Sequence, residues 1–225
     1  MIFRKFMKIK RRQLLIEEAN SFVLLGILES LGKLALADQQ EIANYKILVG
    51  RNPLPFTVDS LELLFDIPRE RIIIRDCSRY KVKDLLLLAF PHHRNDESQW
   101  TNLHKPTAIK AIHKLSREKV RVSGEKKNLI ISRAAAAQRR LYGEEKIQEH
   151  FKDLNFEIVR TEELSFEDQI KLFQNANIVI STHGAGLTNI IFSSDIKVVE
   201  FFPSNRPVNS SFCFTEISSA LGFEH

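Results

Sequence analysis

The sequence has few cysteines and no long apolar run. Its 225 residues include two cysteines, Cys77 and Cys213. Neither lies in a C-x-x-C pair or near a histidine at a zinc-ligand spacing, so the sequence predicts neither a disulfide framework nor a zinc site. No stretch approaches the roughly 20 apolar residues of a membrane span, and we expect no integral membrane segment.

Several nucleotide-binding and hydrolase motifs are also missing. No G-x-G-x-x-G follows a candidate strand, which argues against a dinucleotide oxidoreductase, and the G-x-x-x-x-G-K-[ST] motif of P-loop proteins is absent. The G-x-S-x-G elbow of serine hydrolases does not occur either. No Asp-x-Asp pair is present, which argues against sugar transfer with the nucleotide held on a divalent metal. We expect no metal and no cofactor.

The charge balance is basic, with 33 Lys and Arg against 28 Asp and Glu, a net charge of +5 and a pI of about 9.2. This balance permits a polyanionic partner, but no nucleic-acid-binding motif accompanies the charge. Binding of negatively charged small molecules explains the balance equally well. We therefore predict no nucleic-acid partner.

The most informative segment is I-S-T-H-G-A-G-L-T-N-I-I-F at residues 180–192. It passes from an apolar strand through two glycines into an apolar helical pattern. Such a turn directs backbone N–H groups at an anion, and glycine lets the backbone approach a ligand closely. The alternative is a plain strand-to-helix turn, but the polar side chains around the glycines favour a phosphate or diphosphate site. Its candidate residues are Thr182, His183, Gly184, Ala185, Gly186, Leu187 and Asn189.

The second half of the chain alternates short apolar strands with helices. We predict strands at 129–132, 156–160, 177–181 and 197–202, and helices at 141–151, 165–175, 187–192 and 213–221. Ser165 and Asp168 form a capping-box pattern. This alternation predicts a doubly wound α/β domain, a parallel sheet with helices on both faces. Ligands bind beyond the carboxyl ends of such strands, which groups Arg133, His183 and the end of the last strand.

The first half repeats the same rhythm more weakly. We predict strands at 45–50, 71–75 and 84–90, a helix at 58–65 capped by Thr57, and a helix at 107–119 after Pro106. An amphipathic N-terminal helix is indicated by a stripe of leucines at positions 24, 25, 28, 31 and 34. With a short charged linker near 123–127, the predicted organisation is an N-terminal helical segment (1–40), a first α/β lobe (41–123) and a second lobe (124–225).

Several short blocks stand in an order that resembles a known family. They are Ile130-Ile131-Ser132-Arg133, Arg139-Arg140, Glu144-Glu145, Glu163 to Gln169, His183 to Asn189 and Val199-Glu200. Their order and spacing resemble the catalytic domain of glycosyltransferase family 61, closely over residues 128–202 and more loosely over 41–127. The family includes protein O-linked GlcNAc transferases and many bacterial members of cell-surface polysaccharide loci.

The resemblance implies a GT-B-like fold with two Rossmann-like lobes. The C-terminal lobe would bind a nucleotide-diphosphate-sugar donor, and residues 41–123 would face a glycan or protein acceptor. The implied reaction is metal-independent transfer of a hexosyl or pentosyl group with inversion. The sequence does not indicate a compartment, although a bacterial member would be expected in the cytoplasm. The implied donor-binding residues are Ser132, Arg133, Arg140, Thr182, His183, Gly184, Ala185, Gly186, Leu187, Asn189 and Glu200.

Three of these residues have alternative interpretations from their chemistry alone. Arg133 could pair with phosphate oxygens or form a surface ion pair. Arg140 opens a helix, where a cation does not suit the dipole, so it could meet a ligand charge or lie on a solvated face. Glu200 lies in an otherwise apolar strand, where an unpaired carboxylate is costly. A ribose hydroxyl pair, a neighbouring arginine or a backbone donor would satisfy it.

The chain also departs from the family pattern. The family's His and Asp ahead of the first lobe correspond here to Phe22 and Gly26, neither of which can act as a general base. Gly143 stands where the family commonly has Asn. We therefore assign no catalytic residue. The alternative function is that of a catalytically impaired, donor-binding relative that acts as a binding or scaffold subunit.

Overall fold

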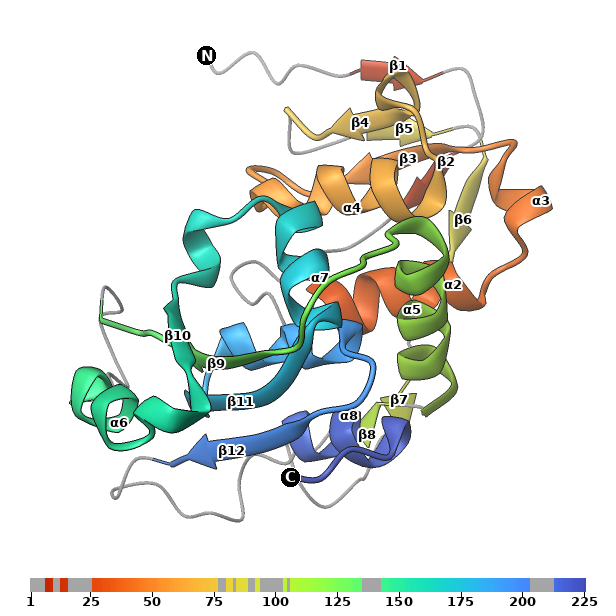
Figure 1. Cartoon of the computed structure of the whole chain (residues 1–225). Helices are drawn as coiled ribbons and strands as arrows, with labels where there is room; N and C mark the ends of the chain where they lie inside the picture. The colour runs from red at the N-terminus through yellow and green to blue at the C-terminus, as the bar shows by residue number, and fades with distance from the viewer. Residues whose placement is uncertain are drawn as a thin grey trace. The chain divides into compact units, whose positions relative to one another are not determined.

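The computed structural model describes residues 7–9, 13–15, 26–76, 80–82, 84–88, 92–93, 103–104, 106–134, 143–202 and 213–225. The chain forms two compact units, Met1–Pro91 and His92–His225. Each unit is mixed α/β and contains a four-stranded parallel sheet (Figure 1). The predicted α/β class with parallel sheets is therefore confirmed. Among the described residues, no helix is long and apolar enough to cross a membrane.

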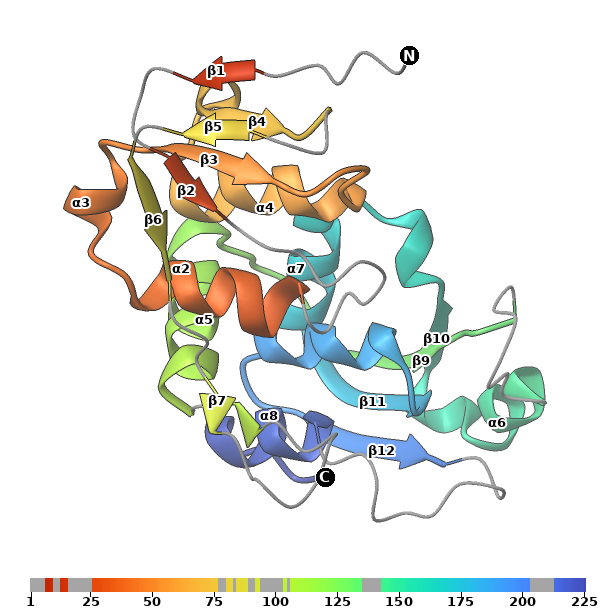
Figure 2. The same ribbon diagram turned by 180° about the vertical axis from the view of Figure 1, so that it is seen from behind.

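The sheet of the first unit has the strand order β4-β3-β2-β6. Its strands are β2 (Gln13–Leu15), β3 (Lys46–Val49), β4 (Ile72–Ile74) and β6 (Leu85–Leu87). A separate parallel pair joins β1 (Met7–Ile9) and β5 (Tyr80–Val82). The helical elements are the π-helix η1 (Gly26–Leu31), α2 (Gly32–Leu36), α3 (Gln39–Ile42), α4 (Pro55–Phe65) and the 3₁₀ turn η2 (Arg69–Arg71). Figure 2 shows the unit from behind.

Several expectations for the first unit are confirmed, but the cap at Thr57 is wrong, and residues 1–40, expected to be helical, also contain the strands β1 and β2. The strands at 45–50, 71–75 and 84–90 are present as β3, β4 and β6. Thr57 does not cap α4, because the helix begins at Pro55 after Leu54 and places Thr57 in its first turn. Of the leucine stripe, Leu28, Leu31 and Leu34 are buried as predicted, and positions 24 and 25 lie outside the described residues.

The sheet of the second unit has the order β10-β9-β11-β12 and is parallel throughout. Its strands are β9 (Lys127–Ile131), β10 (Phe156–Val159), β11 (Ala176–Thr182) and β12 (Lys197–Phe201). The helices are α5 (Pro106–Lys119), α6 (Glu144–His150), α7 (Phe166–Gln174) and α8 (Cys213–Leu221), with 3₁₀ helices η3 (Lys152–Leu154), η4 (Thr161–Glu163) and η5 (Ala185–Phe192). β7 (His92–His93) and β8 (Leu103–His104) form an antiparallel pair. The strands and helices predicted for 124–225 are present, although 187–192 belongs to a 3₁₀ helix.

Side chains alternate between the two faces of this sheet. One face carries Ile130, Ile158, Ile178 and Ile180, which form a core cluster with Phe156 and with Ile147 of α6. The opposite face carries Ile131, against which Gly186 of η5 packs closely. Helices therefore cover both faces of the sheet, as the alternating sequence predicted.

The division between the units falls at Pro91, whereas the sequence placed a linker near 123–127. Helix α5 accounts for the difference, because it packs with α8 and η5 of the second unit. Gln174 of α7 adds to this packing by donating hydrogen bonds to the carbonyls of Ser116 (3.3 Å) and Val120 (2.8 Å). The functional division into acceptor and donor lobes stays a prediction.

Helix α7 begins with the predicted cap. Ser165 Oγ accepts a hydrogen bond from the Asp168 N–H at 3.1 Å, and its hydroxyl donates to the Asp168 carboxylate at 2.6 Å. Replacing Ser165 with Ala should lower the free energy of unfolding by about 0.5–2 kcal/mol, because the Asp168 N–H loses its acceptor. Urea unfolding measures this loss. Ser123→Ala removes an exposed hydroxyl and should change stability by less than about 0.5 kcal/mol.

Candidate functional site

The candidate site lies where the strand order of the second sheet reverses. In the strand order β10-β9-β11-β12, the connection that leaves β9 leads to β10 on one side, and the connection that leaves β11 leads to β12 on the other side. The connections from the two central strands, β9 and β11, therefore run in opposite directions. The register sets Ile131 beside Ser181, and Ser181 beside Glu200. The residues that follow β9 and β11 therefore meet at one edge, which is the usual place for ligands in open parallel sheets.

Arg133 follows β9 and is held by its backbone. Its N–H donates to Glu144 Oε1 at 3.0 Å, and the buried Glu144 is the first residue of α6. The preceding Ser132 N–H donates to the carbonyl of Val159 at 2.8 Å. The Arg133 guanidinium lies directly against Gly184, where a Cβ atom would come within 2.4 Å of Nη1 and 2.9 Å of Cζ. Gly184 thus provides space for the guanidinium next to His183.

The second glycine of the turn serves packing. A Cβ on Gly186 would meet Ile131 Cγ2 at 3.0 Å and Thr161 Oγ1 at 3.3 Å. Leu187 is fully buried, and the buried Asn189 donates through its amide to Gln169 Oε1 at 2.9 Å. These residues fix η5 against β9 and α7. Direct ligand contact for Leu187 or Asn189 stays a prediction.

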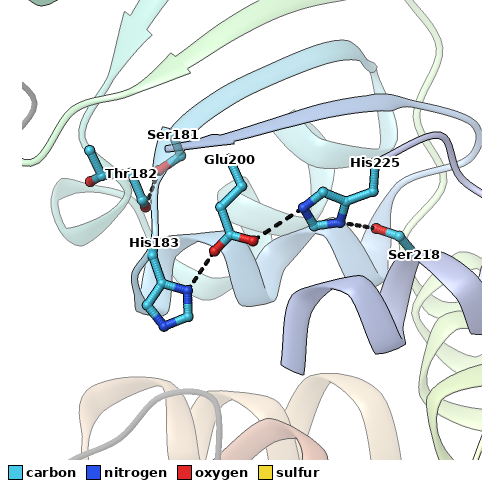
Figure 3. A network of polar contacts seen from close by, with 6 residues as sticks. All are labelled: Ser181, Thr182, His183, Glu200, Ser218 and His225. Atoms are coloured by element: carbon cyan, nitrogen blue, oxygen red, sulfur yellow. Dashed lines mark hydrogen bonds and ion pairs between the residues drawn. The ribbon is translucent and has the colours of Figure 1, made fainter. Parts of the chain in front are cut away.

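His183 and Glu200 form the centre of a buried polar network (Figure 3). His183 Nδ1 lies 2.5 Å from Glu200 Oε1, and His225 Nε2 lies 3.2 Å from Glu200 Oε2. Ser218 Oγ lies 2.9 Å from His225 Nδ1. The Glu200 side chain is only 2% exposed, against 8% for His183 and 10% for His225. Each carboxylate oxygen therefore has its own histidine.

The charge of Glu200 fixes the hydrogen positions on both histidines. Burial alone would raise the pKa of Glu200, but the hydrogen bonds from His183 and His225 outweigh it and leave the pKa below its usual value. An ionised carboxylate can only accept hydrogen bonds. His183 must therefore carry hydrogen on Nδ1 and His225 on Nε2. In the neutral form of His183, the lone pair then lies on Nε2.

Aromatic packing fixes the His183 ring. The ring stacks on Phe202 with centroids 5.3 Å apart and tilts against the buried Phe214 at 5.2 Å. The backbone N–H of His183 donates a hydrogen bond to the carbonyl of Phe201 at 2.8 Å, which extends the pairing of β11 and β12 by one residue. Nε2 points away from Glu200 (Figure 3) and has no hydrogen-bond partner within the described part of the chain. His183 is thus an oriented imidazole with one nitrogen available.

The structure places most of the predicted site residues together. Ser132, Arg133, Thr182, His183, Gly184 and Glu200 lie at the carboxyl edge of the sheet, and Ala185 and Gly186 begin η5. Arg140 lies outside the described residues. His225 and Ser218 were missed, because an isolated histidine 25 residues after Glu200 gives no sequence signal. Glu200 has histidine partners, which were not among the alternatives considered from sequence.

A comparison with protein families identifies the chain. The sequence profile described as Glycosyltransferase 61 matches residues 53–199, which is more than half of the chain. The chain belongs to the glycosyltransferase 61 family. The resemblance recognised in the sequence is confirmed, and membership of this family makes the chain a glycosyltransferase. No curated protein matches the sequence.

A solved structure is similar to this glycosyltransferase. It is a dodecameric iron-containing heptosyltransferase, TibC, in complex with ADP-D-beta-D-heptose. The two chains share 11% sequence identity with a TM-score of 0.42, and the similarity covers 96% of this chain and 75% of the other. Among the described residues of this family 61 chain, no group of three or more His, Cys, Asp or Glu side chains is arranged to hold a metal ion.

The two glycines of the turn should respond differently to a methyl group. In Gly184→Ala the new Cβ displaces the Arg133 guanidinium, the end of a flexible side chain, so stability should fall by less than about 1 kcal/mol. In Gly186→Ala the methyl group presses on Ile131 within the packed interior, and the free energy of unfolding should fall by about 1–3 kcal/mol. Urea unfolding of both variants tests this order. An equal or reversed loss would contradict the packing described here.

Glu200 should also contribute to the acid sensitivity of the fold. Because its pKa is lower in the folded chain than the usual 4.5, its contribution is present above pH 4.5 and is lost as the pH falls through the folded value. Glu200→Gln should be less stable at pH 7 and should lose less stability between pH 5 and pH 3 than the wild type. Unfolding free energies across this pH range test the prediction. Parallel curves would show that Glu200 does not titrate in this way.

Proposed function

We propose that this chain is an inverting, metal-independent glycosyltransferase that uses a nucleotide-diphosphate-sugar donor. The donor diphosphate would bind at the carboxyl edge of β9 and β11, in the lobe 124–225 of a two-lobed GT-B-like arrangement. The observation that carries the proposal is the packing of the Arg133 guanidinium against Gly184, the residue that follows the oriented His183 in the turn.

The chemistry of the leaving group supports this assignment. Transfer from a nucleotide sugar leaves extra negative charge on the diphosphate, and groups already in place stabilise that charge most effectively. Arg133 would donate to phosphate oxygens from its planar guanidinium. His183 would donate from Nε2 as an imidazolium, with its charge balanced by Glu200 through Nδ1. The acceptor would be a glycan or a protein, and its hydroxyl would attack the sugar carbon from the opposite side.

The second candidate function is a donor-binding subunit with little or no transfer activity. The sequence feature that favours it is the lack of a base at the two family positions. Phe22 lies outside the described residues, and Gly26 begins η1 without a side chain to offer. A positioned general base is worth roughly 10²–10⁴ in rate. Activity and donor binding therefore have to be measured separately.

The first test is calorimetry of UDP, ADP and GDP in the presence of a chelator. We expect binding of at least one of them without added metal, because Arg133 and His183 supply the positive charge. Binding that appears only when Mg²⁺ or Mn²⁺ is restored would contradict the metal-free site. Release of nucleoside diphosphate from UDP-, ADP- and GDP-sugars with a panel of glycan acceptors then separates the transferase from the binding subunit.

The second test removes the two proposed contacts. Arg133→Ala and His183→Ala should each weaken binding of the preferred nucleoside diphosphate by about 1.5–3 kcal/mol, the size of a hydrogen bond to a charged group. Arg160→Ala is a matched control, because Arg160 forms an exposed ion pair with Glu163. Cooperative unfolding must persist in all three variants. Unchanged affinity in either site variant would remove that residue from the proposed site.

A further inference from the structure

We propose that His225, together with Ser218, is a positioning residue of the diphosphate site. His225 forms a hydrogen bond to Oε2 of Glu200 and so holds in place the carboxylate that orients His183. The inference rests on the proposed function, because it assigns His183 to the diphosphate. It adds two residues from the C-terminal segment, far in sequence from the turn at 183–186.

The backbone brings His225 to Glu200 by a fixed route. Helix α8 ends at Leu221, and Gly222 has a φ of +79°, a conformation that side chains rarely adopt. The N–H of Phe223 donates a hydrogen bond to the carbonyl of Ser218 at 2.8 Å. Glu224 then pairs with the edge of β12, where its carbonyl accepts from the Val198 N–H at 2.8 Å. His225 is thus held beside Glu200, two residues along β12 from Val198.

The chemistry of Glu200 makes the second histidine necessary. A carboxylate that is 2% exposed has almost no water to satisfy it. With His183 alone, Oε2 would be buried without a donor, which favours either protonation or rotation of the carboxyl group. Protonation would weaken Oε1 as the acceptor that fixes the Nδ1–H of His183, and rotation would withdraw it. The Nε2–H of His225 prevents both changes.

Ser218 supports the tautomer of His225 that Glu200 requires. Because Nε2 of His225 donates to Glu200, Nδ1 of the neutral ring is an acceptor, and the Ser218 hydroxyl at 2.9 Å is placed to donate to it. Without this hydroxyl, only Glu200 favours the required tautomer, and Nδ1 of His225 loses its hydrogen-bond donor. The contacts run from Ser218 through His225 and Glu200 to His183 (Figure 3), and of these four residues only His183 would touch the ligand.

A pH-dependent consequence follows at the ligand. Diphosphate oxygens accept hydrogen bonds, so the Nε2 of His183 must carry a proton in the complex, and an ionised Glu200 balances the resulting charge. In the part of the chain that the structure describes, the other charged or titratable groups near this network include Arg133 against Gly184, Cys213 and Glu216 of α8, and the exposed Lys197–Glu224 pair. Burial, with Glu200 and Glu216, raises the pKa of Cys213 to about 12, so this thiol stays protonated and does not supply the proton.

The experiment compares variants that keep or remove the donor to Glu200. His225→Gln retains an amide N–H, His225→Phe fills the space without a donor, and Ser218→Ala deletes the hydroxyl. Glu224→Gln is the control, because it breaks only the exposed pair with Lys197 on the same segment. Calorimetry of UDP, ADP and GDP, each in Tris and in HEPES between pH 6.5 and 8.5, gives the affinity and the number of protons taken up.

We expect proton uptake on binding by the wild-type chain. His225→Phe should weaken binding about tenfold or more and shift the pH profile of proton uptake, since one charge-assisted hydrogen bond is lost. Ser218→Ala should shift the profile in the same direction by a smaller amount. His225→Gln and Glu224→Gln should stay within about threefold of the wild type and keep its profile.

The outcomes separate this inference from the proposed function. If the wild type binds none of the three nucleotides, the proposed function fails and the inference fails with it. If the wild type binds but Ser218→Ala and His225→Phe keep its affinity and proton uptake, only the inference fails. Thermal unfolding of each variant is recorded in parallel. If His225→Phe does not fold, Ser218→Ala against the wild type decides the question.

Discussion

The buried carboxylate of Glu200 is the interaction on which the candidate site depends. A carboxylate removed from water is costly unless each oxygen is paired. Here the pairing comes from the end of β11 on one side and from the C-terminal segment on the other. Glu200 itself lies in β12, so one side chain ties three parts of the second unit together. The orientation of His183 follows from this arrangement and from its contacts with Phe202 and Phe214.

The order of the parallel strands explains why these residues meet. His183 and Arg133 are 50 residues apart, yet each follows a central strand of the same sheet. The connections that leave the carboxyl ends of β9 and β11 run to opposite sides of the sheet. No crossover connection therefore passes over the carboxyl ends of these two strands.

Much of the second unit could be predicted from sequence. The strands around Ile130, Ile158 and Ile180 are short apolar runs bounded by polar residues, and such patterns depend on local chemistry alone. The cap at Ser165 was equally predictable, because a helix cap is a local interaction. The unit boundary was not, because the place of α5 depends on packing with α8, about 100 residues later. His225 could not be predicted at all. Its role depends on the conformation of Gly222 and on one edge pairing with β12.

The contact between Gly184 and Arg133 has a consequence for sequence variation in this fold. The guanidinium occupies the volume that any side chain at position 184 would need. A Cβ at 184 would therefore move the guanidinium away from the turn, even though the long side chain of Arg133 can adopt another rotamer at little cost. Relatives that carry alanine or serine at the equivalent of 184 should hold the charge of residue 133 in a different position from the one described here.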